Sequence, residues 1–179
     1  MKIIDNFVPK EEFKAIQDLM MGDAFPWYYN DYIIEPSEKE NLNDYQFTHQ
    51  FFKPPYGTVS NYIEIFSSSI EKLKVKLLVR IKANMSPRTS KPVYGGYHSD
   101  VDLKCKTAIL YINTNNGFTQ FKDGNKVESL ANRMVIFDSK DRHSGVTCTD
   151  QKRRVVVNFN YFELLSGQKH TPEYKGFKN

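Results

Sequence analysis

The spacing of apolar residues divides this chain into a helical first part and a strand-rich second part. Residues 5–21 carry apolar side chains at helical intervals. These side chains are Phe13, Ile16, Leu19 and Met20. Pro9 and the acidic residues that follow it are typical of a helix start, and residues 59–73 predict a second helix. We expect the apolar stripe of the first helix to pack on the core.

From residue 75 onward the pattern changes to short runs rich in Val, Ile, Tyr and Phe, separated by polar turns. Such runs are typical of strands. They fall at residues 75–85, 106–113, 133–139 and 153–162. Asp123-Gly124 lies where a tight hairpin turn is expected. This number of strands predicts a double-stranded β-helix of the jelly-roll type.

Two segments, residues 25–33 and 47–57, are dense in aromatic residues but interrupted by Pro and Gly. Such interruption indicates irregular structure. Trp27, Tyr28 and His49 lie in these segments and are candidates for a lid over the barrel mouth that faces substrate. The alternative is that these aromatic side chains pack the helices against the sheet.

The fold class that follows is α+β and mainly β, in one domain over residues 1–179. We expect helical support over about 1–74, a jelly-roll core over about 75–165, and a polar tail over 166–179 in which His170 is a surface residue. A chain of this length buries a sizeable core, and its 40% apolar residues favour folding over disorder. No internal repeat or linker divides the sequence.

Composition and charge limit the partners and the cellular compartment that we expect for this protein. The formal net charge of +4 comes from Lys and Arg scattered along the chain, so nucleic acid is a disfavoured partner. Charges appear at once in the first residues and no apolar run approaches a membrane span, so we expect neither a secretory signal nor membrane association. Cys105 and Cys148 form no CxxC pattern, which favours a reducing cytoplasm over a disulfide.

The chemically most informative residues are His98 and Asp100. On a strand, side chains two residues apart point the same way, so this imidazole and carboxylate would form half of a metal site. His143 follows an apolar run and a short polar loop and would supply a second imidazole. Such a ligand set, with open positions, suits non-haem Fe(II) that binds oxygen and a second ligand. Zinc accepts the same ligands, but the HExxH motif typical of hydrolytic zinc sites is absent. The alternative to a metal site is that these residues are polar side chains on a solvated strand and loop.

Two adjacent arginines open the last strand-like run. Because side chains alternate between the faces of a strand, one of Arg153 and Arg154 is expected to point into the barrel and the other toward solvent. A buried guanidinium needs an anionic partner, and a carboxylate ligand bound by its planar fork supplies one. The alternative is that both arginines lie on a solvated strand end.

Taken together, His98-Ser99-Asp100 is followed by His143 after 45 residues, and His143 by Arg154 after 11. This arrangement resembles the Fe(II)/2-oxoglutarate-dependent dioxygenases, in particular their prolyl-4-hydroxylase-like branch. The pattern of that family is H-x-D, a distal His, and an Arg or Lys about ten residues further on. The resemblance covers about residues 75–162.

The resemblance implies that the catalytic Fe(II) is held by His98, Asp100 and His143. It implies a salt bridge from Arg154 to the far carboxylate of the cosubstrate 2-oxoglutarate, assisted by Tyr111, with Asn84 facing the cosubstrate. Strand alternation favours Arg154 over Arg153 for this role. Thr119 and Gln120 stand where the family often has an acid.

The activity so implied is hydroxylation of a C–H bond with O2, coupled to decarboxylation of 2-oxoglutarate to succinate. The substrate would be a protein side chain such as proline, or a small molecule. Nucleic acid is disfavoured again, because Asn160 stands where the demethylases of the family carry a second arginine. Two alternatives are a non-catalytic jelly-roll binding module and a cupin-like metal protein without 2-oxoglutarate. The sequence carries no signal for an oligomeric state.

Overall fold

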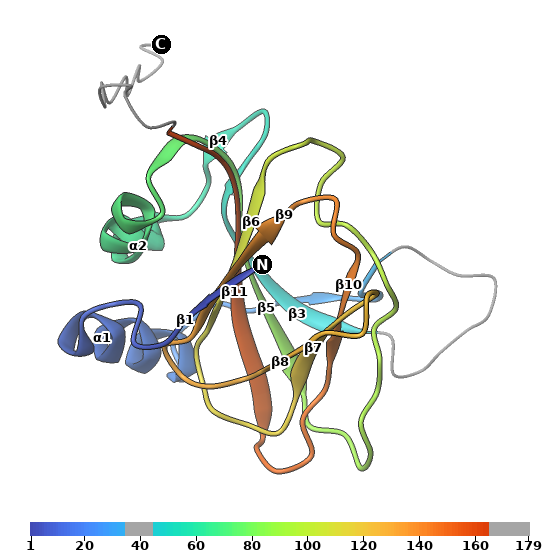
Figure 1. Ribbon diagram of the computed structural model, residues 1–179. Helices are drawn as coiled ribbons and strands as arrows, with labels where there is room; N and C mark the ends of the chain where they lie inside the picture. Colours follow the sequence, from blue (N-terminus) through green and yellow to red (C-terminus); the bar gives the residue numbers. More distant parts are fainter. Residues whose placement is uncertain (35–44, 165–179) are drawn as a thin grey trace.

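The structure is a computed structural model that describes residues 1–34 and 45–164 (Figure 1). The predicted fold class, a mainly β jelly roll with N-terminal helices packed on it, is confirmed. The expected tail over 166–179, including His170, lies outside the described residues. No helix in the described part of the chain is long and apolar enough to cross a membrane.

The helices and strands of the described residues follow one another in this order. They are β1 (Lys2–Ile4), α1 (Lys10–Met21), β2 (Tyr28–Asn30), β3 (Gln46–Lys53), β4 (Gly57–Thr58), the 3-10 helix η1 (Asn61–Phe66), α2 (Ser67–Lys72), β5 (Val75–Pro87), β6 (Lys106–Tyr111), β7 (Phe118–Phe121), β8 (Lys126–Glu128), β9 (Met134–Asp138), β10 (His143–Val146) and β11 (Arg153–Glu163).

Two antiparallel sheets form the body of the fold. The larger has the strand order β1-β9-β6-β11-β5-β3-β2, with β4 paired to β3, and the smaller has the order β10-β7-β8. In Figure 1 the smaller sheet lies across from β11, β5 and β3 of the larger one, and α1 and α2 lie beyond the larger sheet on its other side. Strands distant in sequence are neighbours, since β11 lies between β5 and β6.

The two faces of β11 serve different purposes. Val155, Val157 and Phe159 are buried in the core that the helices share. The ring of Phe159 meets that of Phe66 edge to face at 5.4 Å between centroids. Alternate residues, including Arg154 and Asn158, face the interior of the barrel. The helices therefore cover the outer face of the sheet and leave its inner face to polar residues.

The helix and turn predictions agree with the structure. Pro9 is the N-cap of α1, and the helix buries Phe13, Ile16 and Met20 as its spacing predicts. The second predicted helix is present as η1 followed directly by α2. The turn between β7 and β8 contains Gly124 at a φ of 95°, a conformation that glycine adopts without strain.

The prediction of irregular structure in the aromatic segments is wrong for most of residues 47–57 and agrees with the structure for residues 25–33 outside 28–30. Residues 28–30 form β2, and residues 46–53 form β3, which pairs with β5 in the larger sheet. Aromatic residues favour strands, and the Pro54-Pro55 pair on which the prediction relied follows β3 without interrupting it.

We expect Phe159→Ala to lower the free energy of unfolding by about 3–5 kcal/mol, because it removes a fully buried ring at the junction of β11 with the helices. Phe162→Ala on the same strand, where the side chain is partly exposed, should cost less than about 1 kcal/mol. Urea unfolding of both variants measures the difference. Equal losses would contradict the described position of the core.

Candidate metal centre and adjoining cavity

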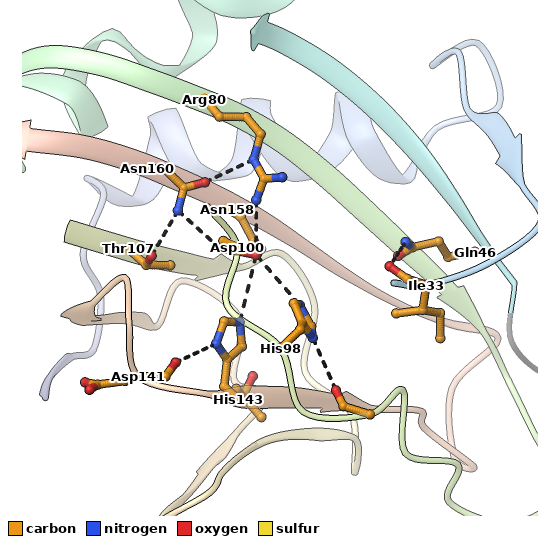
Figure 2. A network of polar contacts seen from close by, with 12 residues as sticks. Ile33, Gln46, Arg80, His98, Asp100, Thr107, Asp141, His143, Asn158 and Asn160 are labelled. Carbon is orange, nitrogen blue, oxygen red and sulfur yellow. Dashed lines mark hydrogen bonds and ion pairs between the residues drawn. The ribbon is translucent and has the colours of Figure 1, made fainter. Parts of the chain in front are cut away.

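His98, Asp100 and His143 come together inside the barrel (Figure 2). One ligand atom from each residue lies within 4.8 Å of the other two. Asp100 Oδ1 lies 3.8 Å from His98 Nε2 and 4.0 Å from His143 Nε2. The side chains of Asp100 and His143 are 5% and 3% exposed. Two imidazole nitrogens and one carboxylate oxygen are thus available to a single divalent ion.

Backbone pairing brings the two histidines together. The amide of His98 donates to the carbonyl of His143 and the amide of His143 to that of His98, each at 3.0 Å. This is an isolated bridge, and Asp100 lies beyond it on irregular backbone. The assumption that a regular strand carries His98 and Asp100 is therefore wrong, although both side chains point to the same place.

Each histidine is oriented by a backbone carbonyl. Nδ1 of His98 lies 3.2 Å from the carbonyl oxygen of Gly96, and Nδ1 of His143 lies 3.2 Å from that of Asp141. Because a carbonyl oxygen only accepts, Nδ1 carries the proton and Nε2 keeps its lone pair. Both Nε2 atoms face Asp100, which is the arrangement that metal-binding histidines require.

Burial lowers the pKa of His143, and the attraction of Asp100 only partly opposes this effect. His143 is therefore neutral near pH 7, the form in which imidazole binds a metal.

Asp100 is held by one cation and two amides (Figure 2). Arg80 Nη2 lies 3.1 Å from Oδ1, and the side-chain amides of Asn158 and Asn160 donate to Oδ2 at 3.1 and 3.3 Å. Arg80 also donates to Asn160 Oδ1 at 3.0 Å. Burial acts to raise the pKa of Asp100, but the attraction of Arg80 and the two imidazoles outweighs it, so the net pKa lies below its ordinary value. The carboxylate is ionised and fixed in direction.

Arg154 faces the same interior and is only 5% exposed. Its Nε donates to Ser129 Oγ at 2.9 Å and its Nη2 to Thr119 Oγ1 at 3.1 Å. Burial lowers the pKa of the guanidinium, an effect that Tyr111 and Cys148 oppose. Among the described residues no carboxylate pairs with Arg154. A buried cation without an anion is costly, so this site favours an anionic ligand.

Thr119 connects Arg154 with Tyr111. The hydroxyl of Tyr111 donates to Thr119 Oγ1 at 2.7 Å, and the same oxygen accepts from Arg154. Thr119 lines the cavity described below, with Tyr111 buried behind it. A Cβ at Gly117 would lie 2.8 Å from Arg154 Cδ, so glycine at this position allows the arginine to pack closely.

Arg153 lies on the other face of β11, but it does not point to solvent as the sequence argument expects. Its Nη2 donates to the carbonyl of Met21, the last residue of α1. Its Nη1 lies 3.9 Å from Met85 Sδ. The alternation that directs Arg154 inward is confirmed; the solvent position of Arg153 is wrong, because α1 covers the outer face of the sheet.

One cavity of about 300 Å³ is lined by the candidate metal ligands His98, Asp100 and His143 at one position and by Arg154 at another. Both sheets contribute to its wall, together with the segment that carries His98 and Asp100. Its lining includes Gln46, Arg80, Lys82, Asn84, Ser86, Ile109, Thr119, Gly145, Arg154, Val156 and Asn158. Its volume is at the lower end of the range for ligand pockets.

Sequence reasoning placed only Asn84 of β5 in this cavity. Arg80, Lys82 and Ser86 line it as well. The signal for them was present, because polar residues 80, 82, 84 and 86 alternate with apolar residues 79, 81, 83 and 85. Asn158 and Asn160 follow the same rule on β11.

None of Trp27, Tyr28 and His49 lines the cavity. His49 is buried, with its Nδ1 2.8 Å from the carbonyl oxygen of Pro26 and its Nε2 2.8 Å from Ser60 Oγ. Trp27 packs against the core, whereas Tyr28 is exposed. The alternative of aromatic packing describes His49 and Trp27, and the substrate role of the three residues stays a prediction.

The comparisons with known proteins bear on the fold. No protein-family model matches this chain, and no curated protein matches it in sequence. A prolyl hydroxylase from Trichoplax adhaerens, solved with a peptide fragment of the hypoxia inducible factor oxygen degradation domain, is 15% identical with a TM-score of 0.62 over 90% of this chain and 83% of that one. A Pseudomonas putida prolyl-4-hydroxylase is 14% identical with a TM-score of 0.57 over 90% and 92%.

An oxidoreductase of the 2OG-Fe(II) oxygenase family from Burkholderia pseudomallei is 9% identical with a TM-score of 0.61, over 89% of this chain and 84% of that one. This chain therefore has the fold of the prolyl hydroxylases and 2OG-Fe(II) oxygenases. The resemblance drawn from the sequence motifs is confirmed at the level of the fold.

Lys82 in the cavity wall leads to a prediction about stability. Burial and the nearby Arg80 lower its pKa from 10.5 to about 8, against an opposing attraction from Asp100. Between these pH values the unfolded chain binds more protons than the folded one, so this residue makes stability rise with pH. Lys82→Met should therefore raise the free energy of unfolding at pH 7 by about 1–3 kcal/mol, and by less at pH 10.

Urea unfolding at both pH values tests this prediction. Lys76→Met is the matched control, because Lys76 lies exposed on the same strand outside the cavity; it should change stability by less than about 0.5 kcal/mol. A loss of stability in Lys82→Met at pH 7, or an equal gain at both pH values, would contradict the prediction.

Proposed function

We propose that this chain is an Fe(II)- and 2-oxoglutarate-dependent dioxygenase that hydroxylates a C–H bond of its substrate. The observation that carries the proposal is a single cavity that joins a His-Asp-His cluster to a buried arginine with no carboxylate partner among the described residues. A cupin-like metal protein has no need of the arginine, and a non-catalytic module has no need of either. The fold shared with 2OG-Fe(II) oxygenases supports the proposed dioxygenase function.

The donor set fits Fe(II). His98, Asp100 and His143 would hold it, with both Nε2 lone pairs and an ionised carboxylate directed to one place. Three protein ligands leave positions open on an octahedral ion. Bound Fe(II) and 2-oxoglutarate would supply oxygen activation coupled to decarboxylation, with succinate as product.

Arg154 would bind the far carboxylate of 2-oxoglutarate. The hydroxyls of Ser129 and Thr119 fix the plane of the guanidinium, and its remaining N–H groups are available for a carboxylate. Arg154 and Asn158, which holds Asp100, are separated by four residues of β11, or about 13 Å of strand. A dicarboxylic acid that lies along the cavity would reach from the candidate metal ligands toward Arg154.

Other residues of the wall would position the cosubstrate and exclude water. Asn84 pairs in register with Val156, between the levels of Arg154 and Asn158, and would contact the cosubstrate. Ile109 and Val156 add apolar surface to the same wall. Tyr111 would act through Thr119, whose hydroxyl it holds.

The substrate would be a protein side chain such as proline or a small molecule. The prolyl hydroxylases among the similar structures support a peptide only through a shared fold. Cys105 and Cys148 are free thiols, which supports a reducing compartment, and we propose the cytoplasm.

An anaerobic titration with Fe(II) and then 2-oxoglutarate tests the function. We expect a weak visible charge-transfer band that His98→Ala abolishes, because the metal loses a ligand. Arg154→Ala should raise the 2-oxoglutarate concentration for half-saturation about 10- to 100-fold, because a charge-assisted bidentate contact is lost. Arg153→Ala, on the other face of β11, is the control and should stay within about threefold. No band in the intact protein, despite bound metal, would contradict the proposal.

The same titration measures the part played by Tyr111. Tyr111→Phe removes the donor that fixes Thr119, so we expect half-saturation by 2-oxoglutarate to rise about 3- to 10-fold, with Fe(II) binding unchanged. Tyr161→Phe is a control at a tyrosine equally buried, but in the core on the helix side. Equal effects of the two substitutions would show that Tyr111 has no specific part in binding the cosubstrate.

A further inference from the structure

Lys82 lies in a row of polar residues that crosses the larger sheet near the candidate metal ligands. It pairs in register with Asn158 on β11 and with Gln50 on β3. Residues directly opposite one another in an antiparallel sheet share a face. Lys82 and Asn158 both line the cavity, and Asn158 holds the metal-site carboxylate Asp100.

The polar groups of this row are incompletely paired within the described part of the chain. Asn158 Oδ1 and Gln50 Oε1 are buried and have no hydrogen-bond partner there. Lys82 makes neither a hydrogen bond nor an ion pair with a described residue, whereas the neighbouring Arg80 is paired with Asp100 and Asn160. The row therefore contains one cation and two acceptors whose partners must come from elsewhere.

The far carboxylate of 2-oxoglutarate would lie too far from this row of polar residues to pair with Lys82. Arg154 lies opposite Ser86, and Ser86 and Lys82 are four residues apart on β5, which is about 13 Å of strand. Lys82 thus lies at the level of the candidate metal ligands, away from the arginine that would bind the far carboxylate. The position is suited to a second organic ligand that must approach the metal.

We propose that Lys82 binds an anionic group of the primary substrate, and that this substrate is a small carboxylic acid with a hydrogen-bond donor for Asn158. The proposal rests on the proposed function and names its substrate class. A carboxylate supplies the anion that the half-buried ammonium of Lys82 favours. An amino or hydroxyl group supplies the donor that the buried amide oxygen of Asn158 lacks among the described residues. The neutral side chain of a peptide proline would pair with neither Lys82 nor Asn158 Oδ1, which the site selects against.

Anaerobic calorimetry on the Fe(II)- and 2-oxoglutarate-loaded protein tests this inference. The probes are the proteinogenic L-amino acids and short-chain hydroxy acids, each beside its primary amide. We expect at least one acid to bind about 10- to 100-fold more tightly than its amide. Lys82→Met should remove that difference, and Lys76→Met should keep it. The same acid should accelerate succinate release by the intact enzyme in the presence of O2.

The visible charge-transfer band separates failure of this inference from failure of the proposed function. A protein without the band is not the proposed enzyme, and the inference fails with it. Where the band forms, three results overturn the inference alone: no acid binds, an acid binds as well as its amide, or Lys82→Met leaves acid binding unchanged. A tenfold rise in the 2-oxoglutarate requirement of Lys82→Met, with acid binding unaltered, would assign Lys82 to the cosubstrate instead.

Discussion

The antiparallel pairing of β5 with β11 is the contact on which both the core and the candidate site depend. Each strand is apolar toward the helices and polar toward the barrel. Ile81, Ala83 and Val157 belong to the core cluster, while Lys82 and Asn158 between them face the cavity. Because the side-chain period of a strand is two, a slip of one residue would exchange these faces. The same register therefore buries the core and assembles the site.

The charges inside the barrel explain which ligands it favours. Asp100 is the one carboxylate among the described residues that line the cavity, and it is already paired with Arg80. Lys82 and Arg154 remain as cations without a carboxylate partner of their own in the described chain. A confined surface with an excess of one charge attracts ligands of the opposite charge. A divalent metal would add to the excess, so both the proposed cosubstrate and the proposed substrate are acids.

The sequence predicts the three candidate metal ligands because their spacing along the chain does not depend on a regular strand. His98 and Asp100 point to one place although only His98 takes part in a bridge. The inward direction of Arg154 is predictable because strand alternation is a local rule. The partners that hold these residues are not predictable from the sequence, because the contacts of Arg80 and Asn160 with Asp100 depend on which strands become neighbours. The sequence does not predict β3 for another reason: the proline and glycine beside this aromatic run indicate irregular structure, whereas the run itself favours a strand.

The two faces of β11 also differ in what they contribute to stability. Among the described residues, Arg154 has no carboxylate partner and the buried amide oxygen of Asn158 has no hydrogen-bond partner, so the burial of both groups costs stability that a ligand would restore. Val155, Val157 and Phe159 on the opposite face bury apolar surface against the helices. An apolar inner face would yield a more stable barrel, but it would hold neither a metal nor an acid. The helices on the outer face thus stabilise the strand whose inner face is arranged for binding.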